Sequence, residues 1–319
     1  MQPRVFITRT IAQSALKRIS EVCQVDLWDG EMPPPNAILA DRVQGVDGVL
    51  SMITDRIDAN IIHAAGAPLK VISNMAVGYN NIDVATAKAR GIAVGNTPGV
   101  LTDATADLTM ALLLAAARRI PESIDYVRSG EWRTWHPEQL LGRDLAGASL
   151  GIVGFGRIGQ AVAQRARAFG MIILAYSPSL TADAAAAQGA TLCDLTTLLK
   201  TADFVSLHTP LNQATLHLIN LDTLALMKPN AILINTSRGR VVDQSALYTA
   251  LTTGMIGGAA LDVTDPEPMH DDDPLLMLNN VLVLPHIGSA THQTRERMAL
   301  IAADNLIAGV TGSPLPYSV

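Results

Sequence analysis

Short apolar segments alternate with longer, helix-compatible segments along the whole chain. Each apolar segment is a continuous run, which is typical of strands buried on both faces of a parallel sheet. The segments fall into a series of five and a series of six, and eleven strands exceed what one sheet usually holds. The pattern therefore predicts an α/β protein with two doubly wound parallel-sheet domains. The predicted strands cover residues 5–7, 25–28, 48–51, 71–74 and 92–94, and then 149–154, 172–176, 204–208, 231–235, 257–263 and 281–285.

Two further helical segments suggest how the domains are connected. Residues 102–119 lie between the two series and are apolar around much of the helix, which is typical of a helix buried between domains or in an interface. Residues 291–308 form an amphipathic segment after the last strand, where no further strand is left to cover. We expect this last helix to return to the first domain. The predicted domains are therefore residues 1–99 with 288–319, and residues 100–287.

Composition excludes several classes of protein. Of the 319 residues 49% are hydrophobic and 16% charged, yet the longest apolar run, residues 110–117, is far shorter than the ~18 residues of a membrane span. A net charge of −6 and 4% aromatic residues argue against a nucleic-acid partner. Only two cysteines occur, Cys23 and Cys193, which favours a reducing, cytoplasmic setting.

A glycine-rich loop follows the first strand of the second series. Gly154, Gly156 and Gly159 stand in the spacing GxGxxG between an apolar strand and a helical segment, 160–169. In that context the first glycine allows the turn, the second lets the backbone approach a pyrophosphate, and the third allows close helix packing. The loop predicts a dinucleotide site. Its expected contacts are Gly154, Phe155, Gly156, Arg157, Ile158 and Gly159.

The end of the next strand bears on the type of cofactor. An NAD site normally has Asp or Glu there, on the ribose 2′-hydroxyl, but this chain has Ser177, Pro178 and Ser179. Without a carboxylate a 2′-phosphate is not repelled, and two hydroxyls can donate to it, although no arginine follows. We expect NADP(H) to be preferred and NAD(H) to be accepted.

Three chemically useful side chains follow three predicted strands. Arg238, Glu267 and His286 each stand just after the carboxyl end of a strand, where ligands bind in open parallel sheets. Any one of them alone fits a solvated loop, but together in a nucleotide fold they predict a reaction site. Histidine donates protons near neutral pH, a carboxylate stabilises the imidazolium, and an arginine fork binds a carboxylate. The acidic turn 271–273 has no matching ligands, so no metal site is predicted.

Six stretches together closely resemble the D-isomer-specific 2-hydroxyacid dehydrogenase family, over essentially the whole chain. The sequence is most similar to the glyoxylate/hydroxypyruvate reductase branch. The resemblance implies a central Rossmann domain for the cofactor, a flavodoxin-like substrate domain built from both termini, and NAD(P)H-dependent reduction of glyoxylate to glycolate and of hydroxypyruvate to D-glycerate. The stretches are NMAVGYNNID (74–83), NTPGVLTDATAD (96–107), GIVGFGRIGQ (151–160), INTSRG (234–239), LDVTDPEP (261–268) and LPHIGSATH (284–292).

The resemblance also implies roles for individual residues. Arg238 binds and polarises the substrate, Glu267 tunes the histidine, and His286 is the acid and base. The backbone amides of Val77 and Gly78 hold the substrate carboxylate, and Ser289 faces the substrate. Further expected cofactor contacts are Thr102, Pro210, Thr215, Thr236, Ser237, Asp262 and Gly288.

A homodimer is implied as well, with the helix 102–119 in its interface. Trp135 matches a tryptophan that reaches the partner subunit's active site in that branch, and packing within a dimer arm is the alternative. Other family members that act on D-lactate, phosphoglycerate or phosphite share the scaffold. A nucleotide-sensing corepressor is a further alternative on the same fold, but this compact acidic chain lacks the basic extensions expected of it.

Overall fold

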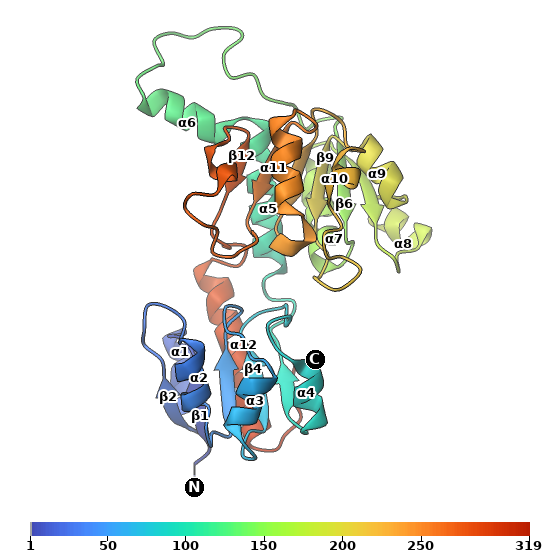
Figure 1. Ribbon diagram of the computed structural model, residues 1–319. Coiled ribbons are helices and arrows are strands. Elements are labelled where there is room, and N and C mark those ends of the chain that lie inside the picture. The colour runs from blue at the N-terminus through green and yellow to red at the C-terminus, as the bar shows by residue number, and fades with distance from the viewer. Residues whose placement is uncertain (1) are drawn as a thin grey trace. The chain divides into compact units, whose positions relative to one another are not determined.

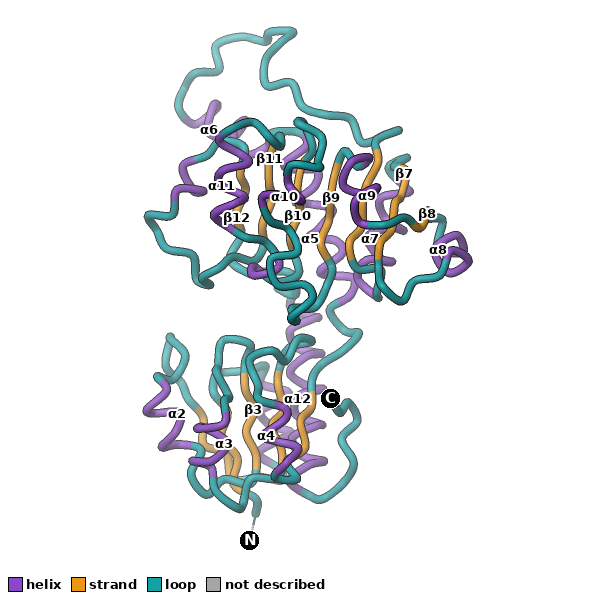
Figure 2. Tube along the Cα trace, turned by 45° about the vertical axis from the view of Figure 1, so that its right-hand side comes forward, coloured by secondary structure: helices purple, strands orange, loops and turns teal. Residues whose placement is uncertain are grey.

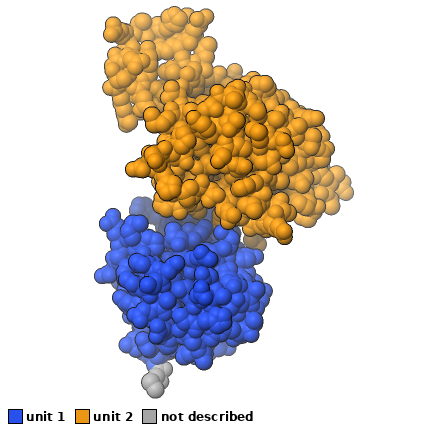
Figure 3. All heavy atoms as spheres, viewed as in Figure 1, with its two compact units in different colours: residues 1–101, 289–319 blue, residues 102–288 orange. Residues whose placement is uncertain are grey.

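The structure is a computed structural model that describes residues 2–319, and it divides into two compact units (Figure 3). Unit 1 comprises the described residues up to Leu101 together with Ser289–Val319, and unit 2 is Thr102–Gly288. The predicted domain boundaries differ from these by one or two residues. Gly288, expected in the first domain, falls in unit 2, where its N–H binds Asp262 and its carbonyl accepts from Thr105.

Unit 1 contains a five-stranded parallel sheet in the order β2-β1-β3-β4-β5, the flavodoxin-like order. The predicted strands of the first series are all present, and no strand end is shifted by more than one residue. The strands are β1 (Arg4–Ile7), β2 (Gln24–Leu27), β3 (Gly48–Ser51), β4 (Val71–Asn74) and β5 (Ala93–Gly95).

Helices cover both faces of this sheet (Figure 2). Alternate strand residues serve opposite faces: Phe6 packs toward α2 and α3, whereas Val5 and Ile7 pack toward α1 and α12. The last helix of the chain lies on β3 and β4, so unit 1 is built from both ends of the sequence. The helices are α1 (Gln13–Ser20), α2 (Asn36–Arg42), α3 (Ala59–Ala65), α4 (Val84–Ala89) and α12 (His292–Val310).

Unit 2 contains a seven-stranded parallel sheet in the order β12-β11-β10-β9-β6-β7-β8 (Figure 1). The strand order reverses between β6 and β9, which makes the carboxyl edge beside them the expected ligand crevice. One strand was not predicted, the two-residue β8, because so short a segment has no periodic signal. The strands are β6 (Ser149–Val153), β7 (Ile172–Tyr176), β8 (Thr191–Leu192), β9 (Phe204–Leu207), β10 (Ile232–Asn235), β11 (Gly258–Leu261) and β12 (Val281–Val283).

The apolar helix α5 (Thr102–Ala117) is buried within unit 2 itself. Its residues Met110, Leu112 and Leu113 belong to the core formed with α7 and the sheet, so its apolar surface is largely used inside this unit. The other face of the sheet carries α9 to α11. The remaining helices are α7 (Arg157–Ala168), α8 (Ala182–Ala187), α9 (Leu195–Thr201), α10 (Leu221–Leu224), α11 (Gln244–Thr252) and the 3₁₀ turns η1 (Gly239–Val241) and η2 (Pro274–Met277).

Helix α6 (Ile120–Arg128) and the loop after it project from the rest of unit 2 (Figure 1). None of the helix residues is buried. The projection begins and ends at non-glycine residues with left-handed backbone, Arg119 (φ 51°) and Leu140 (φ 49°). Its two ends meet where the Arg143 N–H donates to Ala117 O at 2.8 Å. We call residues 120–141 the arm.

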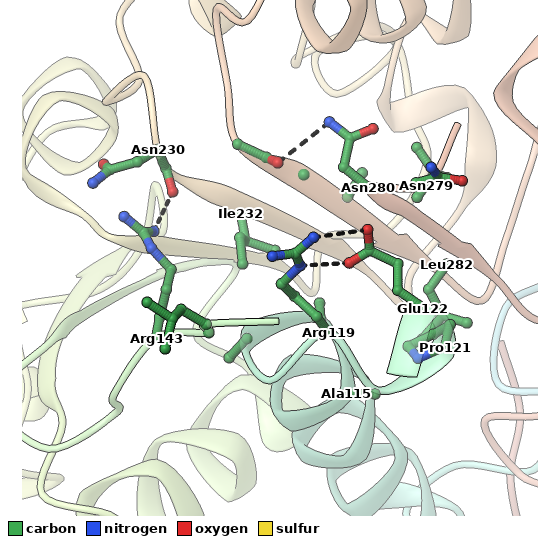
Figure 4. A pocket seen from close by; sticks show the side chains of 18 residues that line it. Ala115, Arg119, Pro121, Glu122, Arg143, Asn230, Ile232, Asn279, Asn280 and Leu282 are labelled. Atoms are coloured by element: carbon green, nitrogen blue, oxygen red, sulfur yellow. Dashed lines mark hydrogen bonds and ion pairs between the residues drawn. The ribbon is translucent and has the colours of Figure 1, made fainter. Parts of the chain in front are cut away.

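A cavity of about 440 Å³ lies at the amino edge of the unit 2 sheet, beside the base of the arm (Figure 4). Both arginines that line the cavity form hydrogen bonds within the protein. Arg119 binds Glu122 through two hydrogen bonds, and Arg143 donates to Asn230 O. Since the strands are parallel, this cavity lies at the edge opposite to the loops that carry Glu267 and His286. No helix in residues 2–319 is long and apolar enough to span a membrane, and Cys23 and Cys193 are not paired.

Candidate active site

The glycine loop joins β6 to α7 with each glycine in a different environment. Gly154 has φ 93°, a left-handed conformation that favours glycine, and a Cβ there would lie 2.6 Å from His208 O. A Cβ on Gly159 would overlap Gly154 O, so this residue lets the helix pack closely. The helix begins at Arg157, three residues earlier than predicted, and Gly159 therefore lies in its first turn.

The space above this loop fits a dinucleotide. A Cβ added to Gly156 would meet nothing within 4 Å, and the N-terminus of the twelve-residue helix α7 begins there. The Thr209 hydroxyl, next to the loop on the chain after β9, is buried without a hydrogen-bond partner among the described residues. An open cradle of backbone N–H groups suits a pyrophosphate. Thr209 was not predicted from sequence, because only the close approach of His208 and Thr209 to Gly154 marks it.

The other expected cofactor contacts follow neighbouring strands at the same edge. Ser177 is half-buried and Pro178 and Ser179 are exposed, directly after β7. Thr215 is committed within its own loop, where it donates to Pro210 O at 2.6 Å and accepts from Asn212 N. Thr215 therefore shapes the loop that presents Pro210.

Arg238 is positioned by the loop after β10. The buried Asn235 accepts from Ser237 N at 3.0 Å and donates to Arg238 O at 2.9 Å, which fixes the turn. Burial lowers the pKa of the Arg238 guanidinium, while the nearby Glu267 carboxylate acts in the opposite direction, and an arginine stays charged. A Cβ on Gly239 would overlap Thr264 O, so the loop that carries Arg238 touches the loop that carries Glu267.

Glu267 and His286 form a direct pair. Glu267 Oε1 contacts Nδ1 of His286, and both side chains are partly exposed, 37% and 29%. The His286 backbone is left-handed, with φ 55°, and its N–H donates to Asp262 O at 2.9 Å. Because Nδ1 faces the carboxylate, Nε2 is the ring nitrogen left for a substrate.

Asp262 holds the residues that follow the histidine. One carboxylate oxygen accepts from Ile287 N at 2.7 Å and the other from Gly288 N at 2.8 Å. Burial raises the pKa of Asp262, and these hydrogen bonds and His286 oppose it. The expectation from sequence was a cofactor contact; in the structure both Asp262 oxygens brace the histidine loop.

Four more expected cofactor residues gather around helix α5. Thr102 begins the helix, and Thr105 Oγ1 donates to Gly288 O at 3.1 Å. Thr236 Oγ1 is 3.0 Å from Thr109 Oγ1, and the Ser237 hydroxyl donates to Asn235 at 2.8 Å. Thr236 and Gly288 are therefore each hydrogen-bonded to α5, whereas Ser237 is bonded within its own turn.

A brace on the Glu267 loop was not predicted from sequence. Gln244, the first residue of α11, accepts from Asp265 N at 3.0 Å and donates to Asp273 at 2.8 Å. Its amide thus joins the chain beside Glu267 to the cap of η2. No motif marks Gln244, because both contacts come from residues more than twenty positions away.

The remaining expected residues belong to unit 1 or to the arm. Val77, Gly78 and Ser289 belong to unit 1, and Trp135 is 78% exposed on the arm. The structure thus brings Arg238, Glu267 and His286 together within unit 2. In residues 2–319 no three of His, Cys, Asp and Glu are grouped as metal ligands. His208 is neutral: burial lowers its pKa to about 3, and its Nε2 lies 2.9 Å from Ser206 Oγ.

Fold and site together define a two-unit α/β protein with a nicotinamide-type dinucleotide domain. Residues 110–288 match the model of the D-isomer specific 2-hydroxyacid dehydrogenase, NAD binding domain. The chain belongs to this family.

Related proteins match over the full length. Glyoxylate reductase from Thermococcus litoralis is 52% identical, covering 100% of this chain and 97% of the relative. The TT0316 protein from Thermus thermophilus has a TM-score of 0.92 and 49% identity, with 99% of both chains covered. The NADPH-dependent glyoxylate/hydroxypyruvate reductase from Sinorhizobium meliloti, solved with NADP and malonate, has a TM-score of 0.86 and 32% identity, covering 100% and 97%.

Proposed function

We propose that the protein reduces small 2-oxo acids, glyoxylate to glycolate and hydroxypyruvate to D-glycerate, with NADPH as the preferred cofactor. The observation that carries the proposal is the Glu267–His286 pair with Arg238 beside it, at the same edge of one parallel sheet as the glycine loop. The relatives named glyoxylate reductase support the substrate class.

The reaction divides between His286 and Arg238. A reduced nicotinamide dinucleotide, with its pyrophosphate held by the glycine loop, would supply the hydride for the carbonyl carbon. The carbonyl oxygen takes the proton from Nε2 of His286, and Glu267 stabilises the charged ring before that transfer. Arg238, whose Nη1 also donates to Ser237 O at 2.6 Å, binds the carboxylate and the carbonyl oxygen through its planar guanidinium. Addition of a hydride and this proton converts the carbonyl group, an aldehyde in glyoxylate and a ketone in hydroxypyruvate, to a hydroxyl, and His286 regains a proton from solvent.

The preference for NADPH rests on the end of β7. Ser177 and Ser179 stand where a carboxylate would select NAD, and both are accessible. The S. meliloti neighbour, described as NADPH-dependent, supports the same choice. Arg157, at the start of α7, adds a positive charge near the loop.

A homodimer is the second part of the proposal, and the arm is its contact surface. Ile120, Ile124 and Val127 are 45%, 43% and 54% exposed and lie along one side of α6. Trp132 and Trp135 continue this apolar surface. A second copy of the chain covers such a surface, and Trp135 then reaches the partner's active site. If Trp135→Ala weakens the dimer but leaves the KM for hydroxypyruvate unchanged, Trp135 only packs in the interface.

Steady-state kinetics tests the reductase. Purified protein is given glyoxylate, hydroxypyruvate, pyruvate or phosphohydroxypyruvate with NADPH or NADH. We expect the first two acids to give the highest kcat/KM, and NADPH to exceed NADH. Turnover of none of the acids would overturn the function, whereas a strong NADH preference would overturn only the cofactor assignment.

A further inference from the structure

Three consecutive backbone N–H groups in unit 1 have no acceptor. They belong to Val77, Gly78 and Tyr79, in the turn after β4, and no described residue accepts a hydrogen bond from them. Val77 and Gly78 are half-buried and Tyr79 is exposed. Backbone N–H groups without a protein acceptor need a partner from outside the chain, and consecutive ones form a concave site that suits an anion.

The carbonyl oxygen of each of these three peptide bonds accepts a hydrogen bond from elsewhere in unit 1. Ala76 O accepts from Thr97 N at 2.9 Å, Val77 O from Asn96 Nδ2 at 2.8 Å, and Gly78 O from Asn74 Nδ2 at 3.0 Å. In a planar trans peptide the N–H points opposite to the C=O. Because the carbonyls of residues 76, 77 and 78 point toward their donors, the N–H groups of residues 77, 78 and 79 point away from those donors.

The two asparagines are themselves fixed. Asn74 is fully buried: its Oδ1 accepts from Ser51 at 3.0 Å, and its Nδ2 also donates to Asn81 Oδ1 at 3.0 Å. Asn81 in turn donates to the carbonyls of Met52 and Asp55. A buried amide whose donors and acceptors are all used has one orientation.

Asn96 is held by the end of the chain. Asn305, buried on α12, donates to Asn96 O at 2.9 Å and accepts from Tyr317 N at 3.0 Å. Asn96 N donates to Tyr317 O at 3.2 Å. The C-terminal helix thus fixes the backbone from which the Asn96 side chain reaches Val77.

We propose that Asn74 and Asn96 are positioning residues that keep the N–H groups of residues 77–79 preset for the substrate carboxylate. Tyr79 N–H is then a donor in addition to the amides of Val77 and Gly78. The inference rests on the proposed reduction of 2-oxo acids, because it assigns the carboxylate of that substrate to this turn.

The test replaces Asn96 by leucine, which has a similar size, no charge and no donor. For Asn96→Leu we expect the KM for glyoxylate to rise about tenfold, as for the loss of one or two ordered hydrogen bonds, with kcat changed less than about threefold. The Ki of oxamate, an anion that is not reduced, rises by the same factor, and the Kd of NADPH stays constant. Asn60→Leu, at an exposed asparagine of α3 in the same unit, is the matched control and changes none of these.

A second measurement needs no variant at the asparagines. The chain has five tyrosines, so selective ¹⁵N-tyrosine labelling gives few amide signals, and Tyr79→Phe identifies that of Tyr79. With the NADPH-saturated protein, oxamate is expected to shift the Tyr79 amide signal. A folded Asn96→Leu variant with unchanged KM and Ki, or a Tyr79 signal that oxamate does not move, would overturn the inference. If oxamate moves the signal but glyoxylate is not reduced, the anion site stands and the proposed function fails.

Discussion

His286 shows how much a single residue depends on its backbone. Its left-handed conformation is uncommon for a residue with a side chain, and three hydrogen bonds to Asp262 hold the chain there. That backbone turns Nδ1 to Glu267 and leaves Nε2 for the substrate. The residue type was predictable, whereas its orientation was not.

For His286→Ala we expect kcat to fall by about 100-fold or more, because the ring that donates the proton is removed. The Kd of NADPH, measured by fluorescence titration, stays within about twofold, since the glycine loop is intact. His270→Ala, on an exposed loop histidine, serves as the control. Turnover of His286→Ala close to that of the unaltered protein would refute the assignment.

Arg238→Lys tests whether the paired N–H donors of the guanidinium matter beyond its positive charge. A lysine keeps the positive charge but cannot make two parallel hydrogen bonds, so kcat/KM for glyoxylate is expected to fall by about 10- to 100-fold. Cofactor binding, measured in the same titration, stays unchanged. An unaltered kcat/KM would mean that Arg238 acts only through its charge.

At the scale of elements, hydrogen bonds from one element position the loop of another. Gln244 links α11 to the Glu267 loop and to η2. In Gln244→Glu a carboxylate would face Asp273, so the loop is expected to loosen and kcat/KM to fall by about three- to tenfold.

The double variant Gln244→Glu with Asp273→Asn reverses donor and acceptor, so it is expected to restore kcat/KM. Ser245→Ala, at the next and exposed position of α11, is the control. A single variant that lowers only the melting temperature would show that Gln244 is structural and does not position Glu267.

Asp203 joins the amino ends of three strands. It accepts from Ser149 N at 2.8 Å, at the start of β6, and from Lys228 Nζ at 2.8 Å, ahead of β10. Burial would raise the pKa of Asp203, but these hydrogen bonds outweigh it and hold the pKa at about 2, below the ordinary 3.8. The stabilisation is therefore fully present above pH 3.8 and is lost as the pH falls through 2.

Asp203→Asn is expected to lower the free energy of unfolding by about 1 kcal/mol at pH 7, a value reduced from the full linkage because solvent screens this partly exposed group. Urea unfolding at pH 7 and pH 3 measures it, and the difference from the unaltered protein shrinks at pH 3. An equal difference at both values would contradict the role of the ionised carboxylate.

At the scale of the whole molecule, the arm groups several exposed apolar side chains within one short segment, Ile120, Ile124, Val127, Trp132 and Trp135. For Ile124→Asp, on the exposed apolar side of α6, we expect light scattering to report a monomer, and for the unaltered protein the dimer that we propose. Leu221→Asp, at a similarly exposed position on α10, is the matched control and stays dimeric. A dimeric Ile124→Asp would remove the arm from the interface.

The sequence by itself determined the two parallel sheets, the glycine loop and the residue types at the strand ends. Continuous apolar runs and the GxGxxG spacing are local signals, so they survive without tertiary contacts. The burial of α5 inside unit 2 was not decided in this way, because an apolar helix looks the same from sequence whether its own core or a partner covers it.

Only the tertiary structure decided which residues position the candidate catalytic and substrate-binding groups. Asp262 clamps the histidine loop, Gln244 braces the Glu267 loop, and Asn305 fixes Asn96 from 209 residues away. The physical reason is that a hydrogen bond between distant segments leaves no periodicity in either of them. Composition and spacing indicate which chemistry a chain carries, and the packed fold sets the direction in which each donor points.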